Sequence, residues 1–93
     1  IPRRFQLLNH RITVRVLPKS EWPEKYADAV GVWDSSRTEI LLLRQPRTQL
    51  RHCFWHEVTH AVLDMMGSKL STNETFVDAF GGLLAQLNDT TEF

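Results

Sequence analysis

A shortage of cysteine, of long apolar runs and of net charge excludes several classes of protein. The 93 residues include one cysteine, so no internal disulfide can form, and we expect a reducing, cytoplasmic setting. No apolar stretch approaches the roughly 18 residues that span a membrane, and the first residues lack a signal-peptide pattern. The 11 basic and 11 acidic residues cancel, which argues against nucleic-acid binding driven by charge.

Lysine and arginine are also scarce in the second half of the chain, where Lys69 is the only such residue after His52. We interpret this asymmetry as a basic sheet layer against an acidic helical layer, whose charge a metal ion partly offsets. The alternative is a basic face that recruits an acidic substrate or partner. The length suits one modest core, so we expect a single domain over residues 1–93, monomeric, to which bound metal adds stability.

Three segments have the residue patterns of β-strands. Arg11–Leu17 alternates apolar and polar side chains, which predicts a half-buried strand. Ala29–Trp33 and Thr38–Leu43 are apolar and β-prone, and the polar residues between them predict a hairpin. Before this hairpin, a serine followed by acids predicts a short helix over Ser20–Ala27.

Two longer helices are expected in the second half of the chain. Pro46 suits the first turn of the first helix, and Gly67 suits its left-handed end. Between them, apolar residues recur at helical spacing and form a buried stripe. Ser71 or Thr72 can cap the second helix, which runs to about Leu87 before the chain frays.

The second helix contains the unusual pair Gly81-Gly82. Each glycine costs about 1 kcal/mol inside a helix, so either close packing against the first helix or a kink is needed to explain the pair. Together, the patterns predict an α+β domain in which a three-stranded, largely antiparallel or mixed sheet packs on two helices.

The segment His56-Glu57-Val58-Thr59-His60 carries the clearest chemical pattern. Residues four apart lie on one face of a helix, about 6 Å along its axis, so His56 and His60 can bind one Zn²⁺ ion. Glu57 then lies beside the ion, where it can take a proton from zinc-bound water and pass it to a leaving amine. The alternative is that both histidines are ordinary surface or core residues.

Two acidic residues, Glu74 and Asp78, lie early in the second helix. The turn after Gly67 lets this helix return against the first, so that Glu74 can supply a third ligand between the imidazoles. Two histidines and one glutamate leave the fourth zinc position open to water, as in catalytic sites. Asp78 can accept the second N–H of a ligand histidine. Alternatively, Glu74 is simply an acid favoured at a helix N-terminus.

Residues Phe54–Leu84 resemble the zinc-binding helices of gluzincin metallopeptidases. The run HEVTHAVLD is similar to the active-site helix of thermolysin-type enzymes, and NETFVD is similar to their second helix. The resemblance implies a zincin-like fold with an active-site helix and a glutamate helix. It also implies that Glu74 is the third zinc ligand and that Asp78 orients His56.

Two departures separate the chain from thermolysin. The link between the two motifs is shorter, and the chain ends where the subdomain that supplies the transition-state His and Tyr would begin. The outline is instead similar to the minigluzincins, single-domain peptidases with a small sheet and two zinc-bearing helices. Tyr26, His10 and Arg37 are the remaining candidates for the missing oxyanion donor.

Other side chains near the motif receive simpler interpretations. A straight helix carries His52 too far from the metal to be a ligand, so we expect a solvated or capping residue, with a place at the cleft edge as the alternative. Asp64 is expected to have a surface or salt-bridge role, and Cys53 to be a small buried residue. The three tryptophans are expected in the core and not in substrate stacking.

These patterns favour a zinc-dependent endopeptidase with one Zn²⁺ per chain. By resemblance, an extended peptide or protein substrate adds as a strand to the hairpin Ala29–Leu43, and we favour its first strand. One alternative is a latent or weakly active zinc-stabilised module that binds a peptide or partner, with an acidic tail ending at Phe93 across the cleft. A second is a zinc amidohydrolase that acts on non-peptide amides.

Overall fold

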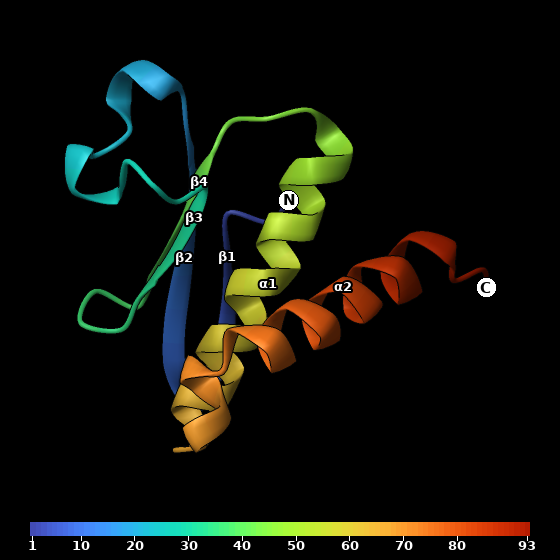
Figure 1. Ribbon diagram of the computed structural model, residues 1–93. Coiled ribbons are helices and arrows are strands. Elements are labelled where there is room, and N and C mark those ends of the chain that lie inside the picture. The colour runs from blue at the N-terminus through green and yellow to red at the C-terminus, as the bar shows by residue number, and fades with distance from the viewer.

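The fold is an α+β arrangement of one four-stranded sheet and two helices (Figure 1), seen in a computed structural model that describes all 93 residues. The sheet order is β1-β2-β4-β3, with β2 and β4 parallel and the two outer pairs antiparallel. The strands are β1 (Arg4–Leu7), β2 (His10–Leu17), β3 (Gly31–Asp34) and β4 (Glu39–Leu43). The helices are α1 (Arg47–Met65) and α2 (Glu74–Thr90), with short 3₁₀ turns η1 (Lys19–Glu21), η2 (Glu24–Tyr26) and η3 (Lys69–Thr72).

The prediction of three strands is wrong, because β1 adds a fourth. This short strand pairs with the start of β2 through a tight turn, in which Leu8 takes the left-handed conformation with φ of 54°. A two-residue turn with positive φ at its first central position usually has glycine there, and a leucine gives no such signal. Phe5 and Leu7 pack against the core, so burial of these side chains stabilises a strand that four residues alone would not predict.

The predicted short helix over Ser20–Ala27 is also wrong, since the segment forms the two separate turns η1 and η2. Pro23 disfavours the helical conformation at the residue before it, and it has no N–H to donate to a helix. Accordingly, Trp22 is extended, with φ of −70° and ψ of 126°. This irregular connection carries the chain from β2 to β3, which lies at the free edge of the sheet.

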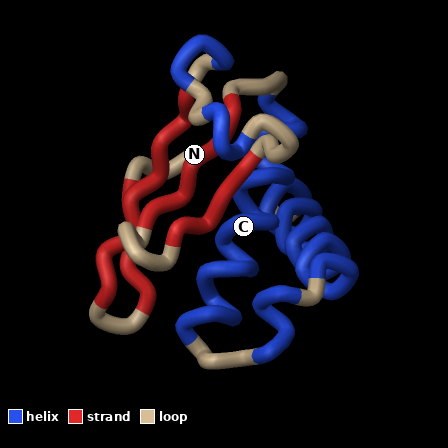
Figure 2. Tube along the Cα trace, turned by 60° about the vertical axis from the view of Figure 1, so that its left-hand side comes forward, coloured by secondary structure: helices blue, strands red, loops and turns tan.

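One face of the sheet is covered by helices and the other is open (Figure 2). Helix α1 packs on the sheet, and α2 packs on α1. Strand alternation turns the apolar side chains toward α1, and the main core cluster consists of Ile12, Val14, Ile40, Leu42, Phe54 and Val58. The intervening arginines of β1 and β2, including Arg4, Arg11 and Arg15, are exposed and therefore face away from the helices.

The end of α1 and the start of α2 both have identifiable caps. Gly67 has φ of 69°, and its N–H and that of Ser68 bond to the carbonyls of Asp64 and Leu63, which ends α1 as predicted. The cap of α2 is Asn73, whose side chain accepts from the Phe76 N–H at 3.0 Å, and not Ser71 or Thr72, which lie in η3. Glu74 is therefore the first residue of α2.

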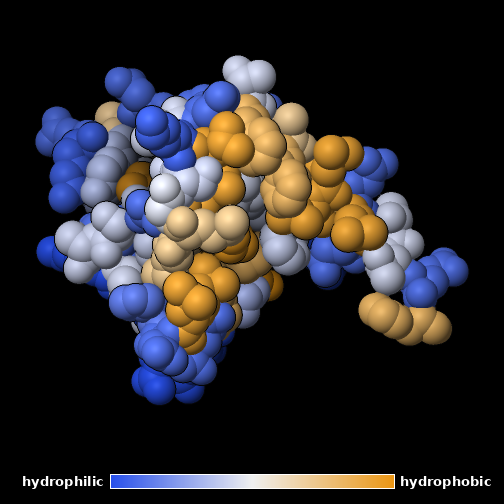
Figure 3. Space-filling view, turned by 90° about the horizontal axis from the view of Figure 1, so that it is seen from below, coloured by the Kyte–Doolittle hydropathy of each residue, from blue (hydrophilic) through white to orange (hydrophobic).

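Helix α2 is continuous through Thr90, so the expected fraying after Leu87 is wrong up to that residue. The residues of α2 that are buried are Val77, Gly81 and Ala85. Phe80, Leu83 and Leu87 are 46%, 66% and 62% exposed, and Figure 3 shows hydrophobic side chains gathered along the arm that leads to the C-terminus. Neither this helix nor α1 combines the length and apolar character needed to cross a membrane.

Close helix packing explains the first glycine of the pair in α2. A Cβ atom at Gly81 would lie 3.0 Å from the Cα and 3.2 Å from the N of His56. Backbone atoms cannot move aside as a side chain can, so only glycine permits this approach. At Gly82 the nearest atom is the Cε1 of the His52 side chain, at 3.2 Å. Of the two explanations for the pair, contact with α1 therefore accounts for Gly81.

We predict opposite effects of alanine at these two positions. Gly81→Ala is expected to lower the melting temperature by about 5–10 °C, because overpacking against a backbone costs roughly 1–3 kcal/mol, which outweighs the helix propensity that alanine gains. Gly82→Ala, the matched control, meets only a movable side chain and gains about 1 kcal/mol of helix propensity, so its melting temperature should be unchanged or higher. Thermal unfolding of both variants tests this, and equal shifts would contradict the close approach of the helices.

Candidate metal centre

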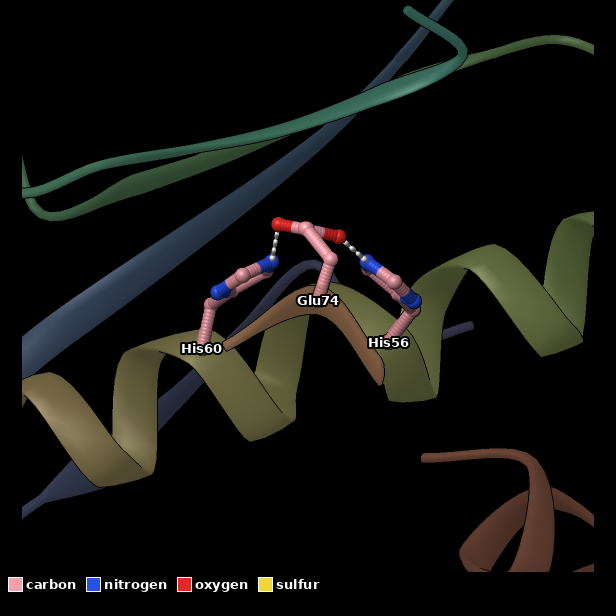
Figure 4. A group of neighbouring side chains, drawn as sticks. All are labelled: His56, His60 and Glu74. Atoms are coloured by element: carbon pink, nitrogen blue, oxygen red, sulfur yellow. Dashed lines mark ion pairs between the residues drawn. The ribbon is translucent and has the colours of Figure 1, made fainter. Parts of the chain in front are cut away.

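Two histidines and one glutamate converge at the crossing of α1 and α2 (Figure 4). His56 and His60 lie on successive turns of α1, with ring centroids 5.0 Å apart. Glu74, at the start of α2, points between them. Its two carboxylate oxygens lie 3.3 Å from His56 Nε2 and 3.0 Å from His60 Nε2.

The geometry of these three side chains fits a metal ion. One ligand atom from each residue can be chosen so that all three lie within 4.8 Å of one another. Around tetrahedral zinc, with bonds of about 2.0–2.1 Å, neighbouring ligand atoms are roughly 3.3 Å apart, so the three side chains are close enough to share one ion after small rotations. The Glu74 side chain is 70% exposed, so the side of the group opposite α1 is accessible to a further ligand.

The second nitrogen of each histidine has its own acceptor. His56 Nδ1 lies 3.5 Å from Asp78 Oδ1, and His60 Nδ1 lies 2.6 Å from the carbonyl oxygen of Ser71. The hydrogen bond at His60 Nδ1 leaves the Nε2 lone pair for a metal and holds the ring in position, and the Asp78 carboxylate favours the same tautomer of His56 from a longer distance. Both imidazoles are therefore oriented with Nε2 toward Glu74.

Glu57 is the one acidic side chain in this region that is buried, with 7% of its surface exposed. It faces the edge strand, where a Cβ atom at Gly31 would lie 3.0 Å from its Oε2. Burial raises the pKa of Glu57 from its ordinary 4.5 to about 7, and the charge of Glu74 acts in the same direction. His60 and the Trp33 backbone amide oppose this rise. The carboxyl is thus poised to exchange a proton near neutral pH.

The raised pKa predicts how the stability of the metal-free protein depends on pH. Between pH 4.5 and about 7 the unfolded chain has lost the Glu57 proton while the folded chain keeps it, so stability falls as pH rises through this window. One pKa unit is worth about 1.4 kcal/mol. The free energy of unfolding of Glu57→Gln, relative to that of wild type, should therefore rise by about 2 kcal/mol between pH 5 and pH 8. Urea unfolding in chelator, with Glu24→Gln as the exposed control, measures this gain. A wild-type-to-variant difference that is the same at both pH values would exclude it.

A cleft of about 750 Å³ runs past this group, between the edge strand and the helices. Its wall on the sheet side is the segment 28–33, which includes the start of β3. On the helical side it is lined by the three candidate ligands together with Glu57, Asp78, His52, Cys53, Ser71 and Thr72. None of the predicted oxyanion candidates, Tyr26, His10 and Arg37, lines the cleft.

Several side chains differ from their simpler interpretations. Asp64 is exposed, as expected for a surface role, but in place of a salt bridge it accepts a hydrogen bond from the Trp33 indole at 3.0 Å, which ties α1 to the edge strand. Trp33 is partly buried and lines the cleft as well as packing on the core. Cys53 is only partly buried, and its Sγ accepts from Gln45 at 3.4 Å.

Sequence reasoning missed two contributors to the site. Gly31 gives Glu57 the room to lie against β3. A glycine within a strand pattern often marks a close backbone approach, so the sequence does contain a signal for this contact. The Ser71 carbonyl, which faces His60, is a backbone group of η3. No residue type signals such an acceptor, so only the path of the chain reveals it.

A comparison of this chain with protein-family models, curated proteins and solved structures found no match.

Proposed function

We propose that this protein is a zinc-dependent metallopeptidase of the gluzincin type, reduced to a single domain like the minigluzincins. The observation that carries the proposal is the convergence of His56, His60 and Glu74 on one point, with Glu57 buried beside them. Two histidines and one carboxylate are the ligand set of catalytic zinc, which leaves a coordination position for water or substrate. A purely structural zinc site is usually closed by four protein ligands.

The residues of the chain have distinct roles in this proposal. His56, His60 and Glu74 hold the ion, and when bound it polarises the scissile carbonyl and acidifies water. Glu57 accepts a proton from the attacking water and delivers it to the leaving amine. Asp78 and the Ser71 carbonyl keep the histidines oriented.

The edge strand supports an extended peptide as the substrate. β3 pairs with β4 on one side and has no strand on the other, and its residues line the cleft that contains the ligands. A peptide can add to such an edge through main-chain hydrogen bonds. These main-chain hydrogen bonds favour a peptide over a small non-peptide amide, which has no extended backbone to pair with the strand.

The latent alternative gains no support from the position of the C-terminus. Phe93 is fully exposed, and none of the residues after α2 lines the cleft. In Figure 1 the C-terminus lies at the far end of α2, away from the start of the helix where Glu74 is placed.

The test is a digest of a mixed peptide library by zinc-loaded protein, with a panel of small non-peptide amides alongside. We expect cleavage of peptides within their chains, loss of cleavage in chelator and recovery on adding zinc. Hydrolysis of the small amides alone would replace the peptidase with an amidohydrolase. Peptide binding without any cleavage would instead favour a binding module.

A further inference from the structure

One basic side chain in the cleft has no role in the proposed chemistry. His52 lies on α1 one turn before His56, and half of its side chain is exposed. It lines the same cleft as the candidate ligands. Its Nε2 lies 3.9 Å from Asp78 Oδ1, the same oxygen that faces His56 Nδ1 at 3.5 Å.

Helix α2 leaves a defined place for the His52 ring. A Cβ atom at Gly82 would lie 3.2 Å from His52 Cε1 and 3.9 Å from its Nε2, so the absence of a side chain there makes room for the imidazole. The carboxylate of Asp78 lies on the same helix, one turn earlier. The second glycine of the pair thus has a local explanation that concerns the cleft and not the helix crossing.

The contacts of β3 show which end of the cleft His52 occupies. Glu57 faces Gly31, and Asp64, further along α1, bonds to Trp33, further along β3. The strand and the helix therefore run in the same direction past each other. His52 precedes Glu57 on α1, so it lies toward the start of β3.

Few hydrogen-bond donors in the cleft remain for a substrate. The Trp33 indole donates to Asp64, and the Thr72 hydroxyl donates to the Lys69 carbonyl. His56 and His60 are committed to the ligand group. Apart from the free edge of β3, the Ser71 hydroxyl and the weakly donating Cys53 thiol, His52 is the donor that a bound peptide can meet.

Resting on the proposed peptidase function, we propose that His52 donates a hydrogen bond to a main-chain carbonyl of the substrate, two to three residues beyond the scissile bond on the leaving-group side. In this proposal the peptide runs antiparallel to β3, so that its C-terminal half lies over the start of that strand, where His52 lies. The ligand pair is centred near position 58, about 9 Å along the helix from His52. Extended chain covers that distance in between two and three residues. His52 is thus a substrate-positioning residue.

The experiment uses two peptides that share the sequence before the scissile bond but have one or four residues after it. Binding is measured to zinc-loaded Glu57→Gln, which needs no turnover, and kcat and KM are measured in the active protein. When His52→Ala is combined with Glu57→Gln, binding of the long peptide should weaken about tenfold, as expected for one lost hydrogen bond. Binding of the short peptide should not change. His52→Gln, which keeps a donor, should recover most of the loss, and KM should change without kcat.

Several outcomes would overturn the inference. These are equally weakened binding of both peptides, unchanged binding of the long peptide, or a fall in zinc content when His52 is replaced. The control His10→Ala, outside the cleft, should match wild type in every measurement. Selective weakening of the long peptide in a protein that never cleaves it would uphold the role of His52 and refute the peptidase. Binding of neither peptide would remove the inference together with its premise.

Discussion

Glu57→Gln is expected to lower kcat for peptide hydrolysis by about 10³-fold while the protein still binds one zinc ion per chain. Glutamine has nearly the same shape but cannot accept the proton of the attacking water, and a general base contributes roughly 10²–10⁴-fold. Because Glu57 faces Gly31 and is not one of the three converging ligands, the metal should be retained. Steady-state kinetics and zinc analysis of the same preparation measure both quantities.

The matched control for this substitution is Glu24→Gln, which makes the same chemical change at an exposed position on η2. It should keep wild-type activity. Full activity in Glu57→Gln would refute the assignment of Glu57 as the base. Loss of zinc in that variant would instead show that Glu57 takes part in holding the ion.

His60→Ala is expected to reduce bound zinc from one per chain to nearly none and to abolish hydrolysis. Zinc binds only the folded arrangement of ligands, so at a free concentration 1,000 times the dissociation constant it adds about 4 kcal/mol of stability. For a domain of this size, each kcal/mol shifts the melting temperature by about 4–8 °C. Zinc should therefore raise the melting temperature of wild type by at least about 15 °C and leave that of His60→Ala almost unchanged.

His10→Ala controls for the loss of a histidine, since His10 is exposed and distant from the cleft lining. Its zinc content and its thermal response should equal those of wild type. If His60→Ala retained one tightly bound zinc ion, the ion would be held elsewhere and the proposed centre would be wrong. Parallel measurements on Glu74→Gln test the ligand that α2 supplies.

The helical half of the molecule was the part most readily predicted from sequence. Histidines four apart on a helix must share a face whatever the surroundings, and Gly67 provides the left-handed turn that ends α1. The cap of α2 was misplaced because Ser71, Thr72 and Asn73 are all suitable capping residues. Which of them is used depends on how far η3 extends before the helix begins.

The sheet was predicted less completely, because its pairing depends on contacts distant in sequence. The hairpin of β3 and β4 has a polar turn, in which Asp34 accepts from the Ser36 and Arg37 backbone amides, and was recognised from it. β1 has four residues and a turn without a glycine signal, so its existence depends on burying Phe5 and Leu7 against the core. The parallel pairing of β2 with β4 likewise joins segments distant in sequence.

By itself, the sequence determined the chemistry available to this protein: two imidazoles one helical turn apart, a neighbouring carboxylate, and an acid early in a second helix. These are properties of residue type and helical spacing, and they hold before any tertiary contact forms. Only the tertiary structure decided that Glu74 meets both imidazoles, because that depends on how closely α2 crosses α1 at Gly81. Likewise, only the approach of β3 to α1 buries Glu57 and raises its pKa, since desolvation is produced by the surrounding atoms and not by the residue.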